Sequence, residues 1–155
     1  MDFTTHKDID APIEYVFQKV ANFDTYERQA LRRGAKVVRV DEAGPVRVGS
    51  AWDVAFTFRG KDRKLRATIA NLAAPQRLEI DTAATGLNSV TGVDLVALSP
   101  TTTRVSVTVN LTAKSLSARL LLQSLKLAKG NLNKRFSRRV AEQVAGVADD
   151  YKRGN

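Results

Sequence analysis

The sequence predicts an α+β fold in which a curved antiparallel sheet wraps around a long C-terminal helix. Three observations lead to this prediction. A strand and a short helix started by a proline come first, a run of alternating apolar and polar residues follows, and a long basic amphipathic segment comes last. Because each alternating strand has one apolar face that must be covered, the helices are expected to pack against that face and enclose a cavity.

The first forty residues predict one strand and two short helices. Residues 3–10 alternate as a strand does, and Asp10-Ala11-Pro12 then predicts a helix start, with Asp10 as the cap and Pro12 in the first turn. Residues 24–33 predict a second helix that stops at Gly34. The first helix is expected to bury a stripe at helical spacing, formed by Ile13, Val16, Phe17 and Val20.

Six strands are predicted next, over residues 35–41, 50–59, 64–71, 77–84, 88–98 and 103–112. The clearest alternation puts Trp52, Val54, Phe56 and Phe58 on one face of the second of these strands. Gly60-Lys61-Asp62 is expected to form a hairpin turn. Because the connections are too short for parallel crossovers, the strands should form an antiparallel meander.

The C-terminal segment predicts one helix from a Ser115 cap to about Tyr151. At ~1.5 Å per residue such a helix would be longer than a small domain is wide, so a bend or break is expected near Gly130-Asn131. Its apolar stripe comprises Leu121, Leu125, Ala128, Leu132, Phe136, Val140, Val144, Val147 and Tyr151.

Length and composition predict one domain over residues 1–155, in a protein that is soluble and cytoplasmic. The chain is 43% apolar and 26% charged, close to an ordinary globular protein. It contains no cysteine, which excludes disulfides and thiolate metal sites. Neither a secretory leader nor an apolar run of the ~20 residues needed to cross a bilayer is recognisable.

The net charge of +9 is concentrated near the C-terminus, where residues 116–155 hold nine Lys/Arg and three Asp/Glu. Such a segment favours anionic partners, or it is simply the solvated face of a helix. Nucleic acid is not the expected partner, because no nucleic-acid-binding motif is present and aromatic residues are not interleaved with the basic ones. Transient contact with an anionic membrane stays open as an alternative, and the sequence indicates no oligomeric state.

No catalytic residue, metal site or cofactor is predicted. His6 is the only histidine, and with no cysteine a zinc site would depend mostly on carboxylates. Glu79 and Asp81 share a strand face, where they are expected to face water and to pair with Arg66 or Lys64. A glycine-rich phosphate-binding loop is absent from the sequence.

Three motifs resemble the START-like superfamily, also called SRPBCC or Bet v1-like. They are DIDAPIEYVF at residues 8–17, VGSAW at 48–52 and PQRL at 75–78. The superfamily includes plant pathogenesis-related allergens, lipid-transfer START domains, and bacterial polyketide cyclase/dehydrase and lipid transport-like proteins. One departure is YERQ at residues 26–29, where many members of the superfamily have a tyrosine followed by proline and tryptophan.

The resemblance implies the helix-grip fold, in which sheet and C-terminal helix enclose an apolar cavity. It therefore implies that the chain binds, or binds and transports, a hydrophobic or amphipathic small molecule or lipid. The implied ligand-binding residues are Tyr26, Trp52, Val54, Phe56, Phe58, Leu78, Ile80, Val107, Val109, Leu125, Leu132 and Phe136. One alternative is a polyketide cyclase/dehydrase-like enzyme, with Tyr26, Arg28 and Asn110 as the first groups to test. The other is an interaction protein whose basic helix binds anionic lipid or nucleic acid.

Overall fold

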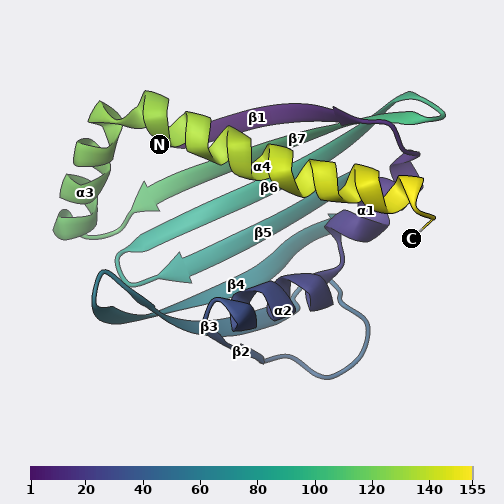
Figure 1. The fold of residues 1–155 in the computed structure, drawn as a ribbon. Coiled ribbons are helices and arrows are strands. Elements are labelled where there is room, and N and C mark those ends of the chain that lie inside the picture. Colours follow the sequence, from purple (N-terminus) through teal and green to yellow (C-terminus); the bar gives the residue numbers. More distant parts are fainter. Residues whose placement is uncertain (155) are drawn as a thin grey trace.

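The computed structural model describes residues 1–154 and shows the predicted α+β architecture, with a curved seven-stranded antiparallel sheet and four helices (Figure 1). The elements in chain order are β1 (Asp2–Ile9), α1 (Ile13–Val20), α2 (Phe23–Arg32), β2 (Lys36–Arg39), β3 (Ala51–Phe58), β4 (Lys61–Ala73), β5 (Arg77–Ala84), β6 (Leu87–Ser99), β7 (Thr102–Ala113), α3 (Leu116–Leu127) and α4 (Lys129–Lys152).

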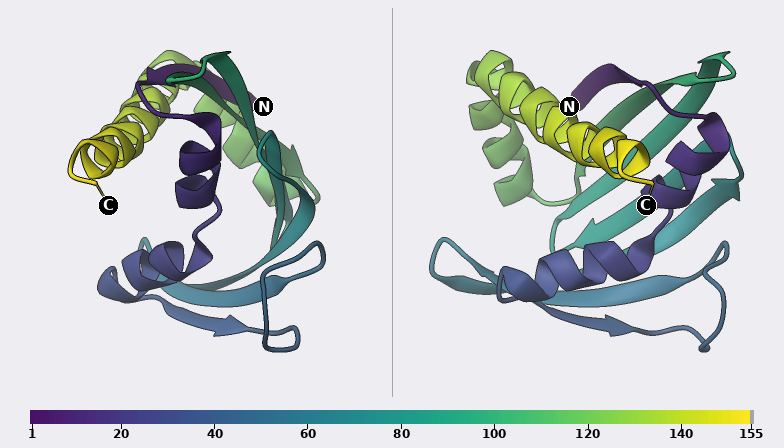
Figure 2. Two further views of the ribbon diagram at one scale, coloured as in Figure 1. Left: turned by 90° about the vertical axis from the view of Figure 1, so that its right-hand side faces the viewer. Right: turned by 45° about the vertical axis from the view of Figure 1, so that its right-hand side comes forward.

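The sheet has the order β1-β7-β6-β5-β4-β3-β2, so the predicted meander from β2 to β7 is confirmed, and β1 closes the other edge beside β7. Register shifts between Ile69 and Asn71 in β4, and between Ala97 and Ser99 in β6, are of the kind that bends a strand and increases its twist. Figure 2 shows the result: α1 sits within the hollow of the sheet, with α4 near one edge and α2 near the other.

The helix starts agree with the sequence prediction in one case and differ in another. Ser115 caps α3 as predicted, by accepting a hydrogen bond of 3.2 Å from the Ala118 amide. Asp10 does not cap α1, whose N-cap is Pro12 without a side-chain hydrogen bond. The reason is the tight turn between the Ala11 amide and the Ile9 carbonyl (2.9 Å), which buries Ala11 and leaves Asp10 exposed.

The hairpin between β3 and β4 turns one residue earlier than predicted. Phe58 pairs with Lys61, so the two loop residues are Arg59 and Gly60, with φ angles of 52° and 74°. Two successive positive φ angles are the signature of a two-residue hairpin turn that matches the twist of the strands. The turn therefore places an arginine at the tip of the hairpin.

The C-terminal helical segment is two helices, and the break lies slightly before its predicted position. Ala128, with φ −107° and ψ 15°, separates α3 from α4, which run in very different directions (Figure 1). The predicted apolar stripe is consequently divided. In α3 the buried side chains are Ala118 and Leu122, whereas Leu121 is exposed, because the contacts of α3 with the sheet select a different face.

The core lies at one end of the concave face, beneath α1 and α2. Two adjoining clusters form it, one comprising Ile9, Ala11, Val16, Phe17, Leu95 and Val105, the other Phe23, Trp52, Ile69 and Leu78. Fully burying one such large aliphatic or aromatic side chain stabilises a fold by about 1.5–3 kcal/mol. We call this the α1 end of the sheet, and the opposite end, with the β3–β4 hairpin and α3, the hairpin end.

The convex face carries cross-strand ion pairs. The Arg104 guanidinium lies 2.9 Å from the Asp8 carboxylate across β1 and β7, and Arg66 lies 2.7 Å from Asp53 across β3 and β4. Glu79 is on this face, as predicted, but its ion pair is with Arg77, at 2.9 Å, rather than with Arg66 or Lys64. Exposed pairs of this kind usually contribute little to stability.

Candidate functional site

The position of α4 leaves part of the concave face open. The helix packs mainly along β1, where the rings of Phe3 and Phe136 are 6.1 Å apart and the hydroxyls of Thr5 and Ser137 are 3.0 Å apart. None of the side chains of α4 is completely buried. A groove therefore remains between α4, β6–β7 and the segment formed by the end of α1 and α2.

The groove has a volume of about 460 Å³, which is within the range of about 300–1,000 Å³ typical of small-molecule sites. Eight of its lining side chains are apolar, seven valines and one phenylalanine: Val20, Val93, Val105, Val107, Phe136, Val140, Val144 and Val147. Polar side chains also line it, namely Lys19, Asn22, Thr25, Tyr26, Gln29, Arg139, Gln143 and Asp150. A groove lined by apolar and polar side chains together suits an amphipathic molecule, whose apolar part would lie on the valines while its polar part meets the polar side chains.

Two cations line the groove, and they differ in their partners. The Lys19 ammonium lies 3.8 Å from the Asp150 carboxylate, a loose and partly exposed pair. Arg139 makes neither a salt bridge nor a side-chain hydrogen bond to any residue within 1–154. Its guanidinium can therefore offer a planar set of donors to a bound carboxylate, phosphate or sulfonate.

Tyr26 joins α2 to the end of α1 at the groove. Its hydroxyl donates a 2.7 Å hydrogen bond to the Val20 carbonyl, and its ring meets that of Phe23 edge-on at 5.8 Å. Although more than a third of the residue is exposed, burial around the hydroxyl raises the pKa of Tyr26 to about 12. The hydroxyl is thus a protonated donor that is already used, and it helps to shape the groove rather than acting as a base.

Of the predicted ligand-binding residues, Tyr26, Val107 and Phe136 line the groove. Trp52, which was expected to line the cavity, is in the core at 6% exposure. Its ring stacks on Phe23 at a centroid distance of 5.1 Å, and its indole N–H donates to the Glu27 carboxylate at 2.5 Å. Helix α2 therefore closes this part of the sheet.

The remaining predicted residues lie outside the groove. Leu78 is buried in the core, and half-buried concave-face positions hold Ile80, Val109, Val54 and Phe56. Phe58 is exposed at the hairpin, Leu125 is half-buried on α3, and Leu132 is half-buried near the start of α4. Whether any of these residues touches a ligand stays a prediction.

The sequence analysis did not identify several of the groove residues, although the spacing of polar residues on α4 could have indicated them. Arg139, Gln143, Gly146 and Asp150 recur at spacings of four, three and four residues, which places them on one side of the helix. This stripe runs beside the part of the apolar stripe that includes Val140, Val144 and Val147. A polar stripe beside an apolar one is a property of any amphipathic helix, and on α4 these residues form the helix side of the groove.

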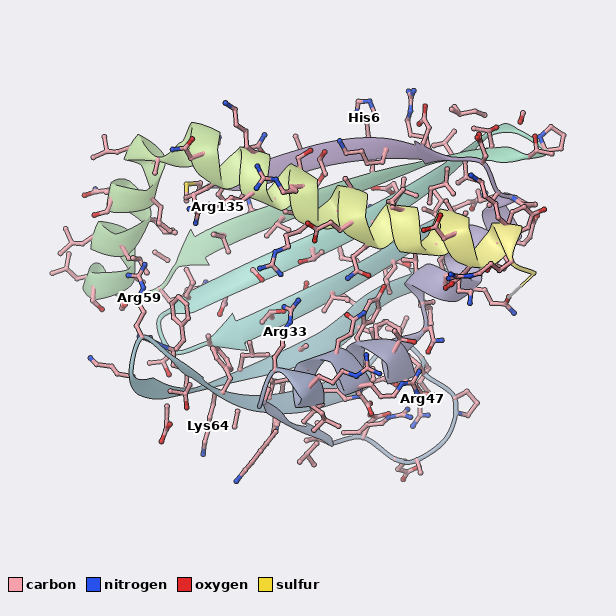
Figure 3. The ribbon with its side chains drawn as sticks, viewed as in Figure 1. His6, Arg33, Arg47, Arg59, Lys64 and Arg135 are labelled. Carbon is pink, nitrogen blue, oxygen red and sulfur yellow. The ribbon has the colours of Figure 1, made fainter. Side chains whose placement is uncertain are left out.

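The groups proposed for catalysis do not converge. Arg28 is exposed and donates to the Thr25 hydroxyl at 3.2 Å, while Asn110 lies on the convex side and bonds to Asp2. His6 points away from the sheet at the β1 edge (Figure 3). Within residues 1–154, no three His, Asp or Glu side chains gather as a metal ion would require.

A second hollow, of about 610 Å³, lies mainly on the convex face across β2, β3, β4 and β5. It is a depression in the twisted sheet, and charged side chains at its surface include Lys36, Lys64 and the ion pair of Arg66 with Asp53. Because this hollow has no covering helix, the groove beside α4 is the better candidate for a ligand site.

Comparison with solved structures confirms the helix-grip, START-like fold. The chain is similar to the Zhui aromatase/cyclase from a Streptomyces species, with a TM-score of 0.68, 14% identity, and coverage of 97% of this chain and 94% of that one. It is also similar to a Staphylococcus aureus protein of unknown function, with a TM-score of 0.63, 12% identity, and coverage of 99% and 97%.

A third similar structure is a Thermus thermophilus protein, with a TM-score of 0.62, 13% identity, and coverage of 95% of this chain and 97% of the other. Identities this low establish the fold alone. No protein-family model and no curated protein sequence matches the chain.

Proposed function

We propose that the protein binds a hydrophobic or amphipathic small molecule, such as a lipid, in the groove between the sheet and α4. The observation that carries the proposal is a groove of about 460 Å³ in which seven valines and Phe136 lie beside polar side chains. Affinity would come mainly from apolar burial, at ~25 cal/mol per Å² removed from water. The fold, which encloses such a space between sheet and helix, supports the same conclusion.

The chemistry of the groove favours a ligand with an acidic head group. Arg139 faces the groove without an ionic partner among residues 1–154, and Lys19 is held only loosely by Asp150. A carboxylate, phosphate or sulfonate next to Arg139 would make charge-assisted hydrogen bonds, while its apolar chain would lie against the valines.

The first experiment is native mass spectrometry of the purified protein, compared with its denatured mass and with an organic extract. A co-purifying amphipathic compound would support the proposal and identify the ligand class. A protein that carries no compound would leave the titration below as the deciding test.

The second experiment titrates the protein with anilinonaphthalene sulfonate, which combines an apolar ring system with an anionic group. Arg139→Gln should weaken binding by about tenfold, because a charge-assisted hydrogen bond is lost. Arg138→Gln is the matched control, since Arg138 is the neighbouring exposed arginine and does not line the groove. Equal affinities of the two variants would contradict the role of Arg139.

A third variant tests the apolar wall. Val140→Phe should fill the groove and abolish probe binding, whereas Val96→Phe, on the exposed convex face of β6, should have no effect. Thermal melting should show that both variants fold. Unchanged binding by a folded Val140→Phe protein would place the probe elsewhere and count against the groove.

A polyketide cyclase-like reaction is the alternative function for the same groove. Its support is the similarity in fold to an aromatase/cyclase, together with Gln29, Arg139 and Gln143, which line the groove and could polarise a carbonyl. The test is incubation with a linear poly-β-ketone and detection of a cyclised product. Product formation that Arg139→Gln slows and Arg138→Gln does not would favour the catalytic function.

A further inference from the structure

Helix α3 exposes large apolar side chains that its packing does not require. Leu127 is 93% exposed, Leu116 is 73% exposed and Leu120 is 56% exposed. The same helix buries Ala118 and Leu122 against its neighbours. Single exposed leucines are ordinary on protein surfaces, but several on one short helix indicate a contact surface.

These leucines lie on one side of the helix. At about 100° per residue, the positions of Leu116, Leu120 and Leu127 fall within about 40° of one another, and those of Ala118 and Leu122 fall on the opposite side. Helix α3 therefore has two apolar faces, of which one packs on the protein and the other faces solvent.

The orientation of α3 is fixed by its attachment to the turn between β5 and β6. The Lys114 amide donates a 2.7 Å hydrogen bond to the Gly86 carbonyl, and Ser115 caps the helix. Gly86 has φ +74°, and a Cβ atom there would lie 2.5 Å from the Ser115 hydroxyl oxygen, so the helix approaches the turn closely. The leucines are thus presented on a helix whose start is anchored.

The chain segment that contains these leucines is basic. Residues 95–141 contain nine Lys/Arg and no Asp/Glu, whereas the rest of the chain contains sixteen of each. The whole net charge of +9 therefore resides in this segment, which includes all of α3. Arg119 and Lys126 are exposed on α3 itself, and Lys129 follows directly at the start of α4.

The β3–β4 hairpin adds a second apolar and basic element at the same end of the molecule (Figures 1 and 3). Phe58 is 53% exposed, and the guanidinium carbons of Arg59 and Arg63 lie 5.3 and 5.6 Å from the centre of its ring. Two separate elements thus combine exposed apolar side chains with nearby cations, and the hairpin also carries the exposed Asp62, which accepts a hydrogen bond from the Thr57 hydroxyl.

We propose that the hairpin end, through the exposed leucines of α3 and the basic residues around them, docks onto an anionic phospholipid surface. Leucines enter the boundary between headgroups and acyl chains, while arginines and lysines pair with phosphates, the combination that holds an amphipathic helix in a membrane interface. Within residues 1–154, no helix is long and apolar enough to cross a bilayer, so the helix would lie in the plane of the membrane.

Other partners fit these residues less well. Single-stranded nucleic acid is bound by cations with several aromatic stacking platforms, whereas the exposed apolar side chains of α3 are leucines and the β3–β4 hairpin adds a single ring, Phe58. A second copy of the chain would bring a surface of the same positive sign, which opposes association. This inference concerns a surface separate from the α4 groove, and it stands or falls independently of the ligand bound there.

The test is co-sedimentation of the full chain with phosphatidylcholine vesicles and with vesicles of phosphatidylcholine mixed with phosphatidylglycerol. The protein should sediment with the mixed vesicles and not with phosphatidylcholine alone, and added salt should release it because the electrostatic part of the interaction is screened. Failure to bind the mixed vesicles at low salt would overturn the proposal.

Two pairs of matched variants separate the apolar and the charged contributions. The triple variant Leu116→Gln, Leu120→Gln and Leu127→Gln should lower the partition coefficient onto the mixed vesicles by about tenfold or more. The control is the triple variant Val38→Thr, Val48→Thr and Val96→Thr, at strongly exposed apolar positions outside α3, which should leave the partition coefficient unchanged. The double variant Arg119→Glu and Lys126→Glu should abolish vesicle binding. The same charge reversal at Arg28 and Arg32 of α2 should weaken vesicle binding much less. Circular dichroism melting should show that each variant folds.

Two further outcomes would overturn the proposal. Equal sedimentation of the leucine variant and the unmodified protein would show that α3 does not insert. A concentration-dependent dimer in sedimentation velocity that the leucine changes abolish, without vesicle binding, would assign the leucines to a second copy of the chain.

Discussion

The α1 end and the hairpin end of the sheet have the same alternation of residues and opposite degrees of burial. On β3, Trp52 is 6% exposed and Phe58 is 53% exposed, although both belong to the concave face. On β5, Leu78 is almost completely buried and Ile80 is half-buried. The difference arises because α1 and the start of α2, where Phe23 is buried, cover the α1 end, while the rest of α2 runs along β2 and β3 toward the hairpin and leaves Phe58 exposed (Figure 2). Alternation determines which face a residue occupies, while the helices determine whether it is buried.

The same comparison separates stability from candidate function. Both core clusters lie at the α1 end, where Val144 and Val147 of α4 also pack, and the groove opens beside them between α4 and β6–β7. The proposed membrane-docking surface lies at the hairpin end. One end of the sheet is therefore expected to carry most of the folding energy, and the following substitutions test that division.

The largest expected effect is a loss of stability at the α1 end. Leu78→Ala should lower the free energy of unfolding by about 2–5 kcal/mol, since it removes a buried side chain and leaves a cavity. Phe58→Ala, at an exposed position of the hairpin end, should cost less than about 1 kcal/mol. Urea unfolding measures both, and comparable losses would show that the hairpin end also contributes to the core.

A smaller loss is expected when the contact between α2 and β3 is broken. Glu27→Ala leaves the buried indole N–H of Trp52 without its acceptor, which should cost about 1–3 kcal/mol. Because Trp52 is the only tryptophan, its fluorescence should also shift to longer wavelength if α2 loosens. Glu27→Gln keeps an acceptor and should be milder; Glu142→Ala, at an exposed position on α4, is the control. Unfolding of the alanine variant at the same urea concentration as the unmodified protein would contradict this account.

An effect confined to acid is expected from Asp41. The guanidinium of Arg39, 2.8 Å away, together with the Ala51 amide and the Ser50 hydroxyl, holds the pKa of this carboxyl well below its usual range. A lowered pKa in the folded state contributes stability above the unfolded pKa of about 3.9, and that contribution is lost as the pH falls further.

Asp41→Asn should therefore lower the melting temperature at pH 7, and the difference from the unmodified protein should shrink below about pH 4. Asp53, whose pKa is lowered by Arg66 in a more exposed pair, is the comparison, and Asp53→Asn should have a smaller effect. A difference in melting temperature that stays constant down to pH 2 would contradict the prediction.

The smallest effects should come from two tyrosines with opposite hydrogen-bond status. Within residues 1–154, the Tyr15 hydroxyl is buried and has no hydrogen-bond partner, so Tyr15→Phe should be neutral or should stabilise by up to about 1 kcal/mol. Tyr26→Phe removes the hydrogen bond to the Val20 carbonyl and should destabilise by about 0.5–1.5 kcal/mol. Calorimetry of the pair checks the signs, and a destabilised Tyr15→Phe protein would indicate that the hydroxyl has a bound water partner.

Much of the fold could be predicted from local patterns. The strand predicted over residues 77–84 is β5 with the same bounds, and the break in the C-terminal helix lies at Ala128, close to its predicted position. Alanine is a good helix former, so propensity alone does not place the break there. The attachment of α3 to the Gly86 turn is a long-range contact, which local sequence does not reveal.

The site was less predictable, for a physical reason. Alternation placed Trp52 on the concave face correctly, but its burial depends on α2 folding across β3, a contact between distant segments. Phe136 and Val107 line the groove because α4 packs along β1, at the edge of the sheet, and does not pack on the central strands. Arg139 could have been identified from the helical spacing of polar residues on α4.

The pairing of β1 with β7 also has a consequence for synthesis on the ribosome. Phe3 lies opposite Val109, so the first strand has no neighbour until about a hundred further residues have been added. At about 5–20 residues per second, β1 waits about 5–20 seconds for its partner strand. Such distant contacts favour slow folding and leave time for aggregation or chaperone binding. The edge that supports α4 is thus completed late, and the groove beside it forms only after α4 has emerged.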